Sequence, residues 1–543
     1  MDRFLLIFTR RFVTLTAIVV AFLLSAALTF WMIHWGFWVW SVPVALAGVL
    51  ALGVHDLVQT RHSILRNYPL IGHLRFILEM IRPEIRQYFF EGDKEGAPFT
   101  RDKRTIVYQR AKKVLSVRPF GTELDVYAEG YEWVRHSIMP NPTADPNFRV
   151  WVGGPDCTQP YSASVFNFSA MSFGALSANA IRALNKGAAM GGFAHDTGEG
   201  GFSPYHAENG GDITWEIGSG YFGARNEDGT FSPERFAETA SRPQIKMVEL
   251  KLSQGAKPGH GGVLPGAKVT AEIAATRGVK QGVDCVSPSR HSSFATPIEM
   301  MQFIARMRRL SGGKPAGFKL CLGHRWEFLA LCKAMLETGL YPDFIVVDGK
   351  EGGTGAAPLE FMDHLGMPLR EGLTFVHNAL RGINARERIR IGASGKIATA
   401  FDIARVLALG ADWCNSARGF MFAVGCLQSQ TCHTDRCPVG VATQDPHRQH
   451  ALHVPDKAVR VRNFHDETMK ALAEFVAAAG LAHPGDFKPE HFSQRVSADE
   501  VLSLRDIYPP LAQGALLEGT LDPRFRDPWM MADAHSFRPR AID

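Results

Sequence analysis

Three cysteines, Cys426, Cys432 and Cys437, lie in one short segment at spacings of six and five residues. A proline, Pro438, follows the last of them, as it often does in iron–sulfur loops. Thiolates are soft ligands that suit iron–sulfur clusters or zinc, and zinc would take His433 as a fourth ligand. Because His433 is adjacent to Cys432 in the sequence, a shared tetrahedral site would be strained. The segment therefore favours an iron–sulfur cluster with three cysteine ligands.

Five glycine-rich loops are the second group of residues that could do chemistry. They span residues 169–174, 197–201, 254–259, 348–355 and 392–396. Most of them follow a predicted strand, and in a barrel of parallel strands such loops form the face where active sites are built. In the last loop Gly395 allows close approach of the backbone to a phosphate, and Lys396 and Arg418 add positive charge. A flavin mononucleotide (FMN) fits a positive phosphate end and a flat ring pocket lined by glycine.

Four charged residues, Glu199, Lys251, Lys257 and Arg277, stand near these loops. A cationic group beside a flavin can bind a dicarboxylate substrate or polarise its carbonyl or imine. A glutamate can relay a proton. Since a lone lysine or arginine is most often a solvated surface charge, these roles are hypotheses.

The elements that would position these residues alternate between short apolar runs and helical segments. Strand candidates are 165–168, 247–251, 317–320, 344–347, 389–391 and 413–416. Helix candidates are 179–190, 267–276, 297–310, 327–336 and 399–408. Strands that alternate with helices indicate a parallel sheet covered by helices, and over this length a closed α/β fold, the (β/α)8 TIM barrel, is expected.

The first 55 residues differ in composition from the rest of the chain. Two uncharged runs, 12–33 and 36–54, are each about long enough for a helix to cross a ~30 Å hydrocarbon core. They predict a transmembrane helical hairpin. A cleaved signal peptide is the alternative, and the second long run directly after the first argues against it. Arginines on both flanks place both ends on the cytoplasmic side, at the inner (cytoplasmic) membrane with the catalytic body in the cytoplasm.

We therefore expect a hairpin over 1–55, a linker over 56–150, the barrel with its cysteine loop over 151–450 and a helical C-terminal extension over 451–543. Residues 74–90 of the linker are apolar at helical spacing and interleaved with arginines, which fits either a bilayer surface or packing on the body. The net charge of +5 is too small a bias for a nucleic-acid partner. The other five cysteines are scattered in the way expected of reduced thiols.

The body resembles the FMN-binding synthase domain of glutamate synthase. The resemblance runs from about residue 169 to 444 and rests on segments 170–174, 197–201, 254–259, 264–266, 352–356 and 432–444. Stand-alone, membrane-anchored glutamate synthase-like proteins are the most similar kind. The resemblance implies a 3Fe-4S cluster on Cys426, Cys432 and Cys437. It also implies that reduced FMN converts 2-iminoglutarate, formed from 2-oxoglutarate and ammonia, to L-glutamate.

The resemblance also implies roles for single residues. It makes Glu199 and Lys257 catalytic, and it makes Lys251 and Arg277 ligands of the substrate carboxylates. The expected flavin contacts are Met171, Ser172, Lys319, Gly353, Gly395, Lys396 and Arg418.

Two departures leave the substrate open. The family typically reads Lys-Pro-Gly-Glu-Gly-Gly-Gln where this chain has His260 and Val263 at the fourth and seventh positions. Loss of a buried amide partner costs ~1–3 kcal/mol of binding free energy for a substrate that needs it. We therefore expect a small-molecule substrate that is a 2-oxo acid or an amino acid, and the departures leave open which one.

Partners are expected because the chain shows no nicotinamide-binding domain and no amidotransferase domain. We expect an external electron donor or acceptor, such as ferredoxin or quinone, and a separate ammonia-supplying protein. Two alternatives stay open: a membrane-linked amine or amino-acid dehydrogenase that passes electrons to quinone, and a non-catalytic redox or scaffold subunit.

Overall fold

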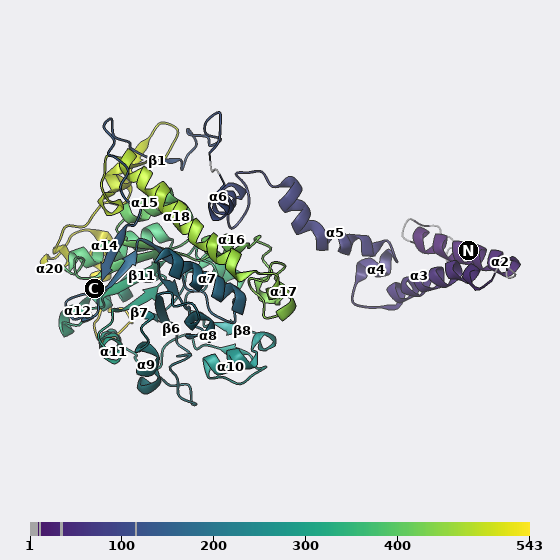
Figure 1. The fold of residues 1–543 in the computed structure, drawn as a ribbon, viewed down its shortest axis with the longest axis horizontal. Helices are drawn as coiled ribbons and strands as arrows, with labels where there is room; N and C mark the ends of the chain where they lie inside the picture. The colour runs from purple at the N-terminus through teal and green to yellow at the C-terminus, as the bar shows by residue number, and fades with distance from the viewer. Residues whose placement is uncertain (1–8, 10–11, 33–35, 115–116, 543) are drawn as a thin grey trace. The chain divides into compact units, whose positions relative to one another are not determined.

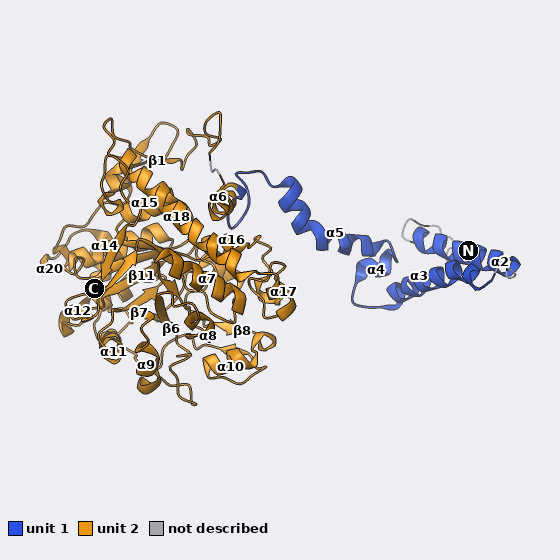
Figure 2. Cartoon of the chain, viewed as in Figure 1, with its two compact units in different colours: residues 1–101 blue, residues 102–543 orange. Residues whose placement is uncertain are grey.

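The computed structural model describes the whole chain except residues 1–8, 10–11, 33–35, 115–116 and 543. It divides into two compact units, residues 1–101 and residues 102–543 (Figure 2). The arginines at positions 3, 10 and 11, on the N-terminal flank of the predicted hairpin, lie outside the described residues.

Eight parallel strands of the second unit close into a barrel (Figure 1). In order around the barrel they are β4 (Phe166–Phe168), β5 (His195–Asp196), β6 (Ile213–Ile217), β7 (Ile245–Lys251), β10 (Ala316–Leu320), β11 (Phe344–Asp348), β12 (Arg390–Ser394) and β13 (Trp413–Ser416). β13 pairs with β4, which leaves no free edge. The TIM barrel predicted from the sequence is therefore confirmed.

Six of the eight barrel strands coincide with predicted strands, and two were missed. β5 has only two residues, too few to show a pattern. β6 reads Ile-Thr-Trp-Glu-Ile and is buried throughout. Its buried glutamate and threonine interrupt the apolar run that marks the other strands, which is why the sequence did not reveal it.

The helices of the barrel begin where the sequence places good caps. α11 (Pro297–Leu310) has the predicted bounds, and Thr296 and Glu299 form its capping box. α15 (Ala400–Ala408) begins after Thr399, whose hydroxyl accepts the N–H of Asp402. The prediction over 267–276 was wrong at its start, because α10 (Ala271–Arg277) begins after the cap Thr270 and a separate turn, η5 (Gly266–Lys268), precedes it.

The remaining helices around the barrel are α7 (Ala178–Gly191), α8 (Pro204–Ala207), α9 (Pro233–Ala240), α12 (Arg325–Thr338), α13 (Leu359–His364), α14 (Leu369–Gly382), α16 (Arg418–Val424) and α17 (Pro446–His450). A short ribbon, β8 (Val263–Leu264) with β9 (Cys285–Val286), precedes and follows α10. These inserted elements lie in the loop that joins β7 to α11, so they belong to the catalytic face.

A hairpin closes the other end of the barrel. β2 (Arg149–Val152) pairs with β3 (Tyr161–Ser164), and Val152 and Tyr161 join a buried cluster with Phe344 and Trp413, the first residues of β11 and β13. Gly392 of β12 makes room there, since a Cβ at this position would lie 2.6 Å from the Trp413 indole. Apolar packing fills the bottom of the barrel and leaves the opposite end for polar chemistry.

The C-terminal part wraps the barrel. α18 (Val454–Ala478) packs along α7 and α16 and includes the predicted helical start of the tail. After α18, β14 (Phe492–Arg495) and β15 (Val501–Ser503) form a small sheet with β1 (Glu132–Val134), which comes from before the barrel. The chain then ends with α19 (Leu504–Ile507), α20 (Ala515–Glu518) and α21 (Pro523–Met531). Glu132 binds Arg370 and Arg405, which ties this sheet to α14 and α15.

The first unit holds two apolar helices long enough to cross a membrane. They are α2 (Val13–Trp31) and the continuous segment of η3 (Phe37–Trp40) and α3 (Ser41–Val58), with mean hydropathies of 2.3 and 2.0. Only 11% of each apolar window is buried, unlike the core helix of a soluble protein. Length and composition alone are weak evidence for a membrane span.

Among the described residues, this unit also holds α4 (Ser63–Asn67), α5 (Gly72–Ile85) and the short π-helix η4 (Arg86–Phe90). The buried Asp56 accepts hydrogen bonds from the Leu70 N–H at 2.9 Å and from His73 Nε2 at 3.0 Å, which fixes the turn between α3 and α5. Along α5 the apolar side chains of Leu74, Ile77 and Met80 are exposed.

Candidate functional site

The predicted site residues gather at the carboxyl ends of the barrel strands. Met171 and Ser172 follow β4, Glu199 follows β5, Lys251 ends β7 and Lys319 lies in β10. Gly353 follows β11, Gly395 and Lys396 follow β12, and Arg418 begins α16 after β13. The fold therefore brings residues that are up to 247 positions apart, from 171 to 418, to one end of the barrel.

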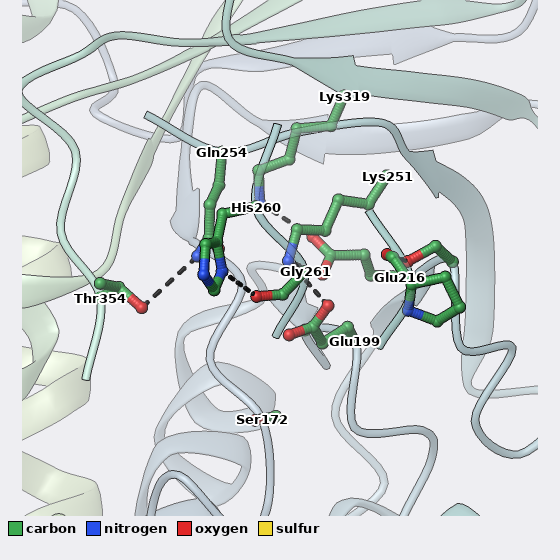
Figure 3. A network of polar contacts seen from close by, with 12 residues as sticks. Ser172, Glu199, Glu216, Lys251, Gln254, His260, Gly261, Lys319 and Thr354 are labelled. Carbon is green, nitrogen blue, oxygen red and sulfur yellow. Dashed lines mark hydrogen bonds and ion pairs between the residues drawn. The ribbon is translucent and has the colours of Figure 1, made fainter. Parts of the chain in front are cut away.

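An ion-paired chain crosses this face (Figure 3). Lys251 Nζ donates to Glu199 Oε2 at 3.0 Å and lies 3.9 Å from Glu216 Oε1. Lys319 Nζ donates to Glu216 Oε2 at 2.8 Å. Glu216, which the sequence analysis did not single out, thus stands between the lysine predicted to bind substrate and the lysine predicted to contact the flavin.

The lysines keep Glu199 ionised. Burial would raise the pKa of this carboxyl, but Lys251, followed by Lys257 and Arg277, lowers it to about 2. Burial opposes charge on Lys251, and the carboxylates of Glu199 and Glu216 raise its pKa above the ordinary value. At neutral pH this contact is therefore a carboxylate–ammonium pair, and Glu199 carries no proton to donate.

Two glycines make room for Glu199. A Cβ on Gly262 would lie 2.2 Å from Glu199 Oε1, and a Cβ on Gly218 would lie 2.9 Å from its Cβ. A larger residue at Gly262 would displace the Glu199 carboxylate from its place beside Lys251.

Beneath the ion pairs lie three buried carboxylates. Asp196, Glu216 and Glu249 each place an oxygen within 4.8 Å of the others, and none is more than 3% exposed. Burial, with the charge of Glu216 second, raises the pKa of Asp196 to about 7, and burial also raises that of Glu249 well above its ordinary value. Burial alone would lower the pKa of Lys319, but these same carboxylates raise it well above the ordinary value. The Lys319 ammonium therefore stays charged.

Glu216 is the one carboxylate of β6, and Glu249 is the one carboxylate of β7. A lone carboxylate in a buried strand was the signal that could have identified both from the sequence, since burying a charge costs free energy unless it is paired.

Lys257 differs from the other two lysines. It is 6% exposed, and within the described residues its ammonium group has no hydrogen-bond or ion-pair partner. Burial lowers its pKa below the ordinary value, against the opposing charge of Glu199. A buried ammonium with a lowered pKa and a neighbouring carboxylate is suited to giving up a proton.

Arg277 is 4% exposed and is held by the loop after β4. Its guanidinium donates to the Phe173 carbonyl at 3.1 Å and to Ser172 Oγ at 3.4 Å, and it stands 5.2 Å from the centre of the Phe222 ring. The residue predicted to bind a substrate carboxylate thus also braces the loop that carries Met171 and Ser172.

The two departures from the family pattern lie at the rim of the site. His260 Nδ1 contacts the Gly261 carbonyl at 2.7 Å, and its ring meets the edge of Phe361 at 5.3 Å (Figure 3). Val263 is 42% exposed and begins β8. The positions that differ therefore lie in the segment between β7 and α10, after Lys257 and before Arg277.

The predicted phosphate end forms a glycine cradle with two cations. A Cβ on Gly353 would lie 2.9 Å from the Arg418 guanidinium, and Gly395 has φ +145°, which L side chains rarely adopt. Arg418 donates to the Glu351 carbonyl at 2.6 Å, and burial lowers its pKa to about 10. Lys396 is exposed. Partial burial, and after it the charge of Arg418, lowers the pKa of the Lys396 ammonium. These residues fit a group that carries a phosphate.

The cysteine loop lies between α16 and α17 and contains the turn η6 (Cys432–Thr434). Burial raises the pKa of Cys426 to about 12, and the charges of Cys432 and Cys437 add to this, so the three thiols are close enough to affect one another. The Gln428 N–H points at Cys426 Sγ at 3.4 Å, and Lys268 Nζ donates to the Cys432 carbonyl at 3.1 Å.

The three thiols are not among the groups of ligand atoms that lie close enough together to hold a single ion. Within the described residues, the only three ligand atoms found within 4.8 Å of one another belong to the carboxylates above. A single zinc ion with ~2.3 Å bonds to sulfur would need its thiolates closer than that. Three neighbouring thiols with a wider separation, a donor N–H and a nearby ammonium fit a larger iron–sulfur group.

Comparison with known proteins is consistent with this site. A family model described as the conserved region in glutamate synthase matches residues 157–482. The chain is 40% identical over 508 residues to the glutamate synthase large subunit-like protein YerD of Bacillus subtilis, which covers 86% of this chain and 96% of that protein. It is 35% identical over 312 residues to the archaeal glutamate synthase (NADPH) of Methanocaldococcus jannaschii, which covers 57% of this chain and 58% of that protein.

Among solved structures, a flavocytochrome b2 with pyruvate bound covers 84% of this chain and 93% of its own, at 10% identity and a TM-score of 0.41. A mandelate oxidase with (S)-2-phenylpropionate covers 74% and 98%, at 13% identity and a TM-score of 0.40. TM-scores this low do not support a conclusion about function. The barrel is established by the strand pairing of this chain.

Proposed function

Because the chain belongs to the glutamate synthase family, we propose that it is an FMN- and iron–sulfur-dependent oxidoreductase that reduces the imine of a 2-oxo acid to an amino acid. The observation that carries the proposal is the set of Lys251, Lys257 and Glu199 on the face that also holds the glycine cradle with Arg418. In the family this imine is 2-iminoglutarate and the product is L-glutamate.

FMN, when bound, supplies the hydride that adds to the imine carbon. The protein must supply the proton that goes to the imine nitrogen, and Lys257 is the group placed to do so. Glu199 stays ionised, so it holds Lys251 in place and offsets the charge of Lys257 rather than acting as the acid. Lys251 and Arg277 provide the positive charge that attracts the substrate carboxylates.

Around the cofactors, Met171, Ser172 and Lys319 would contact the flavin, while Gly353, Gly395, Lys396 and Arg418 would hold its phosphate. Cys426, Cys432 and Cys437 would hold a 3Fe-4S cluster, which supplies electrons when bound. Electrons would come from an external donor such as ferredoxin, and ammonia from a separate protein.

The purified full-length protein, with flavin and cluster both present, tests this function. We expect glutamate to form when reduced ferredoxin or dithionite is supplied with 2-oxoglutarate and ammonia. No amino acid from any 2-oxo acid tested, with both cofactors present, would contradict the proposal.

A membrane-linked dehydrogenase remains a second candidate, and the two long apolar helices favour it, since glutamate synthesis needs no membrane. An amino acid would lose hydride and a proton, and the electrons would pass to quinone. Quinone reduction that depends on an added amino acid, without amination of 2-oxoglutarate, would identify this direction. The retained ion-paired lysines argue against a non-catalytic redox or scaffold subunit.

The first unit supports anchoring of the protein to the cytoplasmic face of the inner membrane. Helix α5 adds an exposed apolar surface beside Arg75 and Arg82, as in helices that lie on a bilayer. We expect the full chain to stay in the membrane pellet after washing with alkaline carbonate. A chain that lacks residues 1–58 should lose this retention, and release of the full chain would contradict the anchor.

Replacing Cys432 by serine is expected to remove the broad iron–sulfur absorption and the electron paramagnetic resonance signal of the oxidised cluster. The physical reason is that a serine hydroxyl is a poor ligand for a soft iron–sulfide group. Cys414, buried in β13 away from the loop, provides the control, and Cys414→Ser should keep both signals. An unchanged cluster in Cys432→Ser would show that the ligand assignment is wrong.

A further inference from the structure

A second polar site lies outside the face described above. A cavity of about 350 Å³ opens between α9 and the C-terminal end of α10. It is lined by, among others, Phe202, Arg225, Arg235, Arg242, Thr276 and Arg277. A volume of this size is in the range of small-molecule sites. Of the predicted site residues only Arg277 lines it, and no carboxylate does.

The four guanidinium groups in this cavity lack carboxylate partners. Within the part of the chain that the structure describes, no ion pair joins Arg225, Arg235 or Arg242 to an acidic side chain. Arg225 donates only weakly, to the Gly220 carbonyl at 3.4 Å. The charge of Arg225 lowers the pKa of the exposed Asp228 only as a minor contribution, after the hydrogen bonds from Thr230. Positive charge therefore gathers here without an ion-paired carboxylate among the described residues.

Two of these arginines also have a buried nitrogen without an acceptor. Nε of Arg225 and Nε of Arg277 are both inaccessible to solvent and make no hydrogen bond. Arg277 is 4% exposed, so an unsatisfied donor on it carries a cost of about 1–3 kcal/mol. Arg242 is held over the Phe202 ring at 5.3 Å, which orders this cation at the cavity wall.

We propose that this cavity binds a small anion that carries two or more phosphate groups. Guanidinium groups match phosphate oxygens in pairs, and several of them together favour a polyvalent anion over a single carboxylate. The hydroxyl of Thr239 lines the same cavity and can donate to a further oxygen. The site is separate from the glycine cradle of Gly353 and Gly395, so it is a second phosphate-binding region.

Arg277 couples this cavity to the catalytic face. The same guanidinium contacts Ser172 and the Phe173 carbonyl, and its charge is one of those that lower the pKa of Glu199. A polyanion on its other side would neutralise part of that charge. This second part of the inference rests on the proposed function, and it makes the affinities for polyanion and for the 2-oxo acid depend on each other.

Calorimetric titration of the full-length holoprotein with inorganic pyrophosphate and with triphosphate tests the binding. We expect saturable binding that weakens as salt is raised, and a loss of at least tenfold in affinity in Arg235→Gln/Arg242→Gln. Arg309→Gln, which removes an exposed arginine on α11, is the matched control and should bind as the unaltered protein does. No binding, or equal binding by the double variant, would overturn the proposal. Tighter binding of citrate than of triphosphate would overturn its ligand class.

The binding result is independent of any catalysis, so its failure is distinct from failure of the proposed function. Arg235→Gln/Arg242→Gln should keep the basal rate of amino acid formation because neither residue touches the catalytic face. In the unaltered protein, saturating triphosphate should change the KM for the 2-oxo acid, and the double variant should not show this change. A KM that triphosphate leaves unchanged in both would overturn the coupling while leaving the binding result in place.

Discussion

Replacing Lys257 by methionine is expected to lower the rate of amino acid formation by roughly 10²–10⁴-fold, the usual contribution of a positioned general acid. The substitution keeps the length and apolar stem of a side chain that is 6% exposed, so the fold and the flavin and cluster content should stay the same. Steady-state kinetics with 2-oxoglutarate and ammonia measure the effect. Lys280→Met, an exposed lysine just after α10, is the control and should leave the rate unchanged.

The pH dependence gives a second readout for Lys257. Because burial lowers its pKa from the ordinary 10.5, the protonated form that donates is lost as pH rises through that lowered value. The rate should therefore fall on the alkaline side at a pH below 10.5, and the residual rate of Lys257→Met should not show this fall. A full rate in Lys257→Met, or an alkaline fall that survives the substitution, would assign proton donation to another group.

Replacing Lys319 by methionine is expected to give the largest loss of stability of any single change in the site. The ammonium is 4% exposed and is surrounded by Glu216, Asp196 and Glu249. Without it, Glu216 would keep only the more distant Lys251 ammonium at 3.9 Å. Breaking a buried pair on one side costs about 3–5 kcal/mol because an uncompensated charge remains. Denaturant unfolding of the second unit measures it, and flavin content should fall as well, since Lys319 is expected to contact the ring.

Two further variants separate charge from packing. Lys314 is as buried as Lys319, but its ammonium donates to the carbonyls of Ala240 and Arg242, so Lys314→Met should cost less and keep the flavin. Adding Glu216→Gln to Lys319→Met removes one orphaned carboxylate and should restore part of the lost stability. If Lys319→Met cost no more than Lys314→Met, the ion-pair account of this cluster would be wrong.

Much of the fold could be predicted because its elements carry local signals, whereas the roles of the site residues follow from the resemblance and stay predictions. The run at 344–347 is apolar and bounded by loops, and Gly395 follows the predicted strand at 389–391 where the backbone turns with a positive φ. The spacing of Cys426, Cys432 and Cys437 is a local chemical signal of the same kind. Such patterns reflect the immediate needs of the backbone and of metal ligands, which is why they are visible without the fold.

The sequence by itself determined a barrel with glycine loops, a loop of three thiols and two apolar runs, because each follows from composition over a few neighbouring residues. Only the tertiary structure decided that Glu216 links Lys251 to Lys319, that Glu199 is ionised, and that three carboxylates share one buried space. It also decided that Arg277 faces a second cavity with three other arginines. Charge interactions depend on distance and burial in space, and residues that lie far apart in the chain acquire both only when the barrel closes.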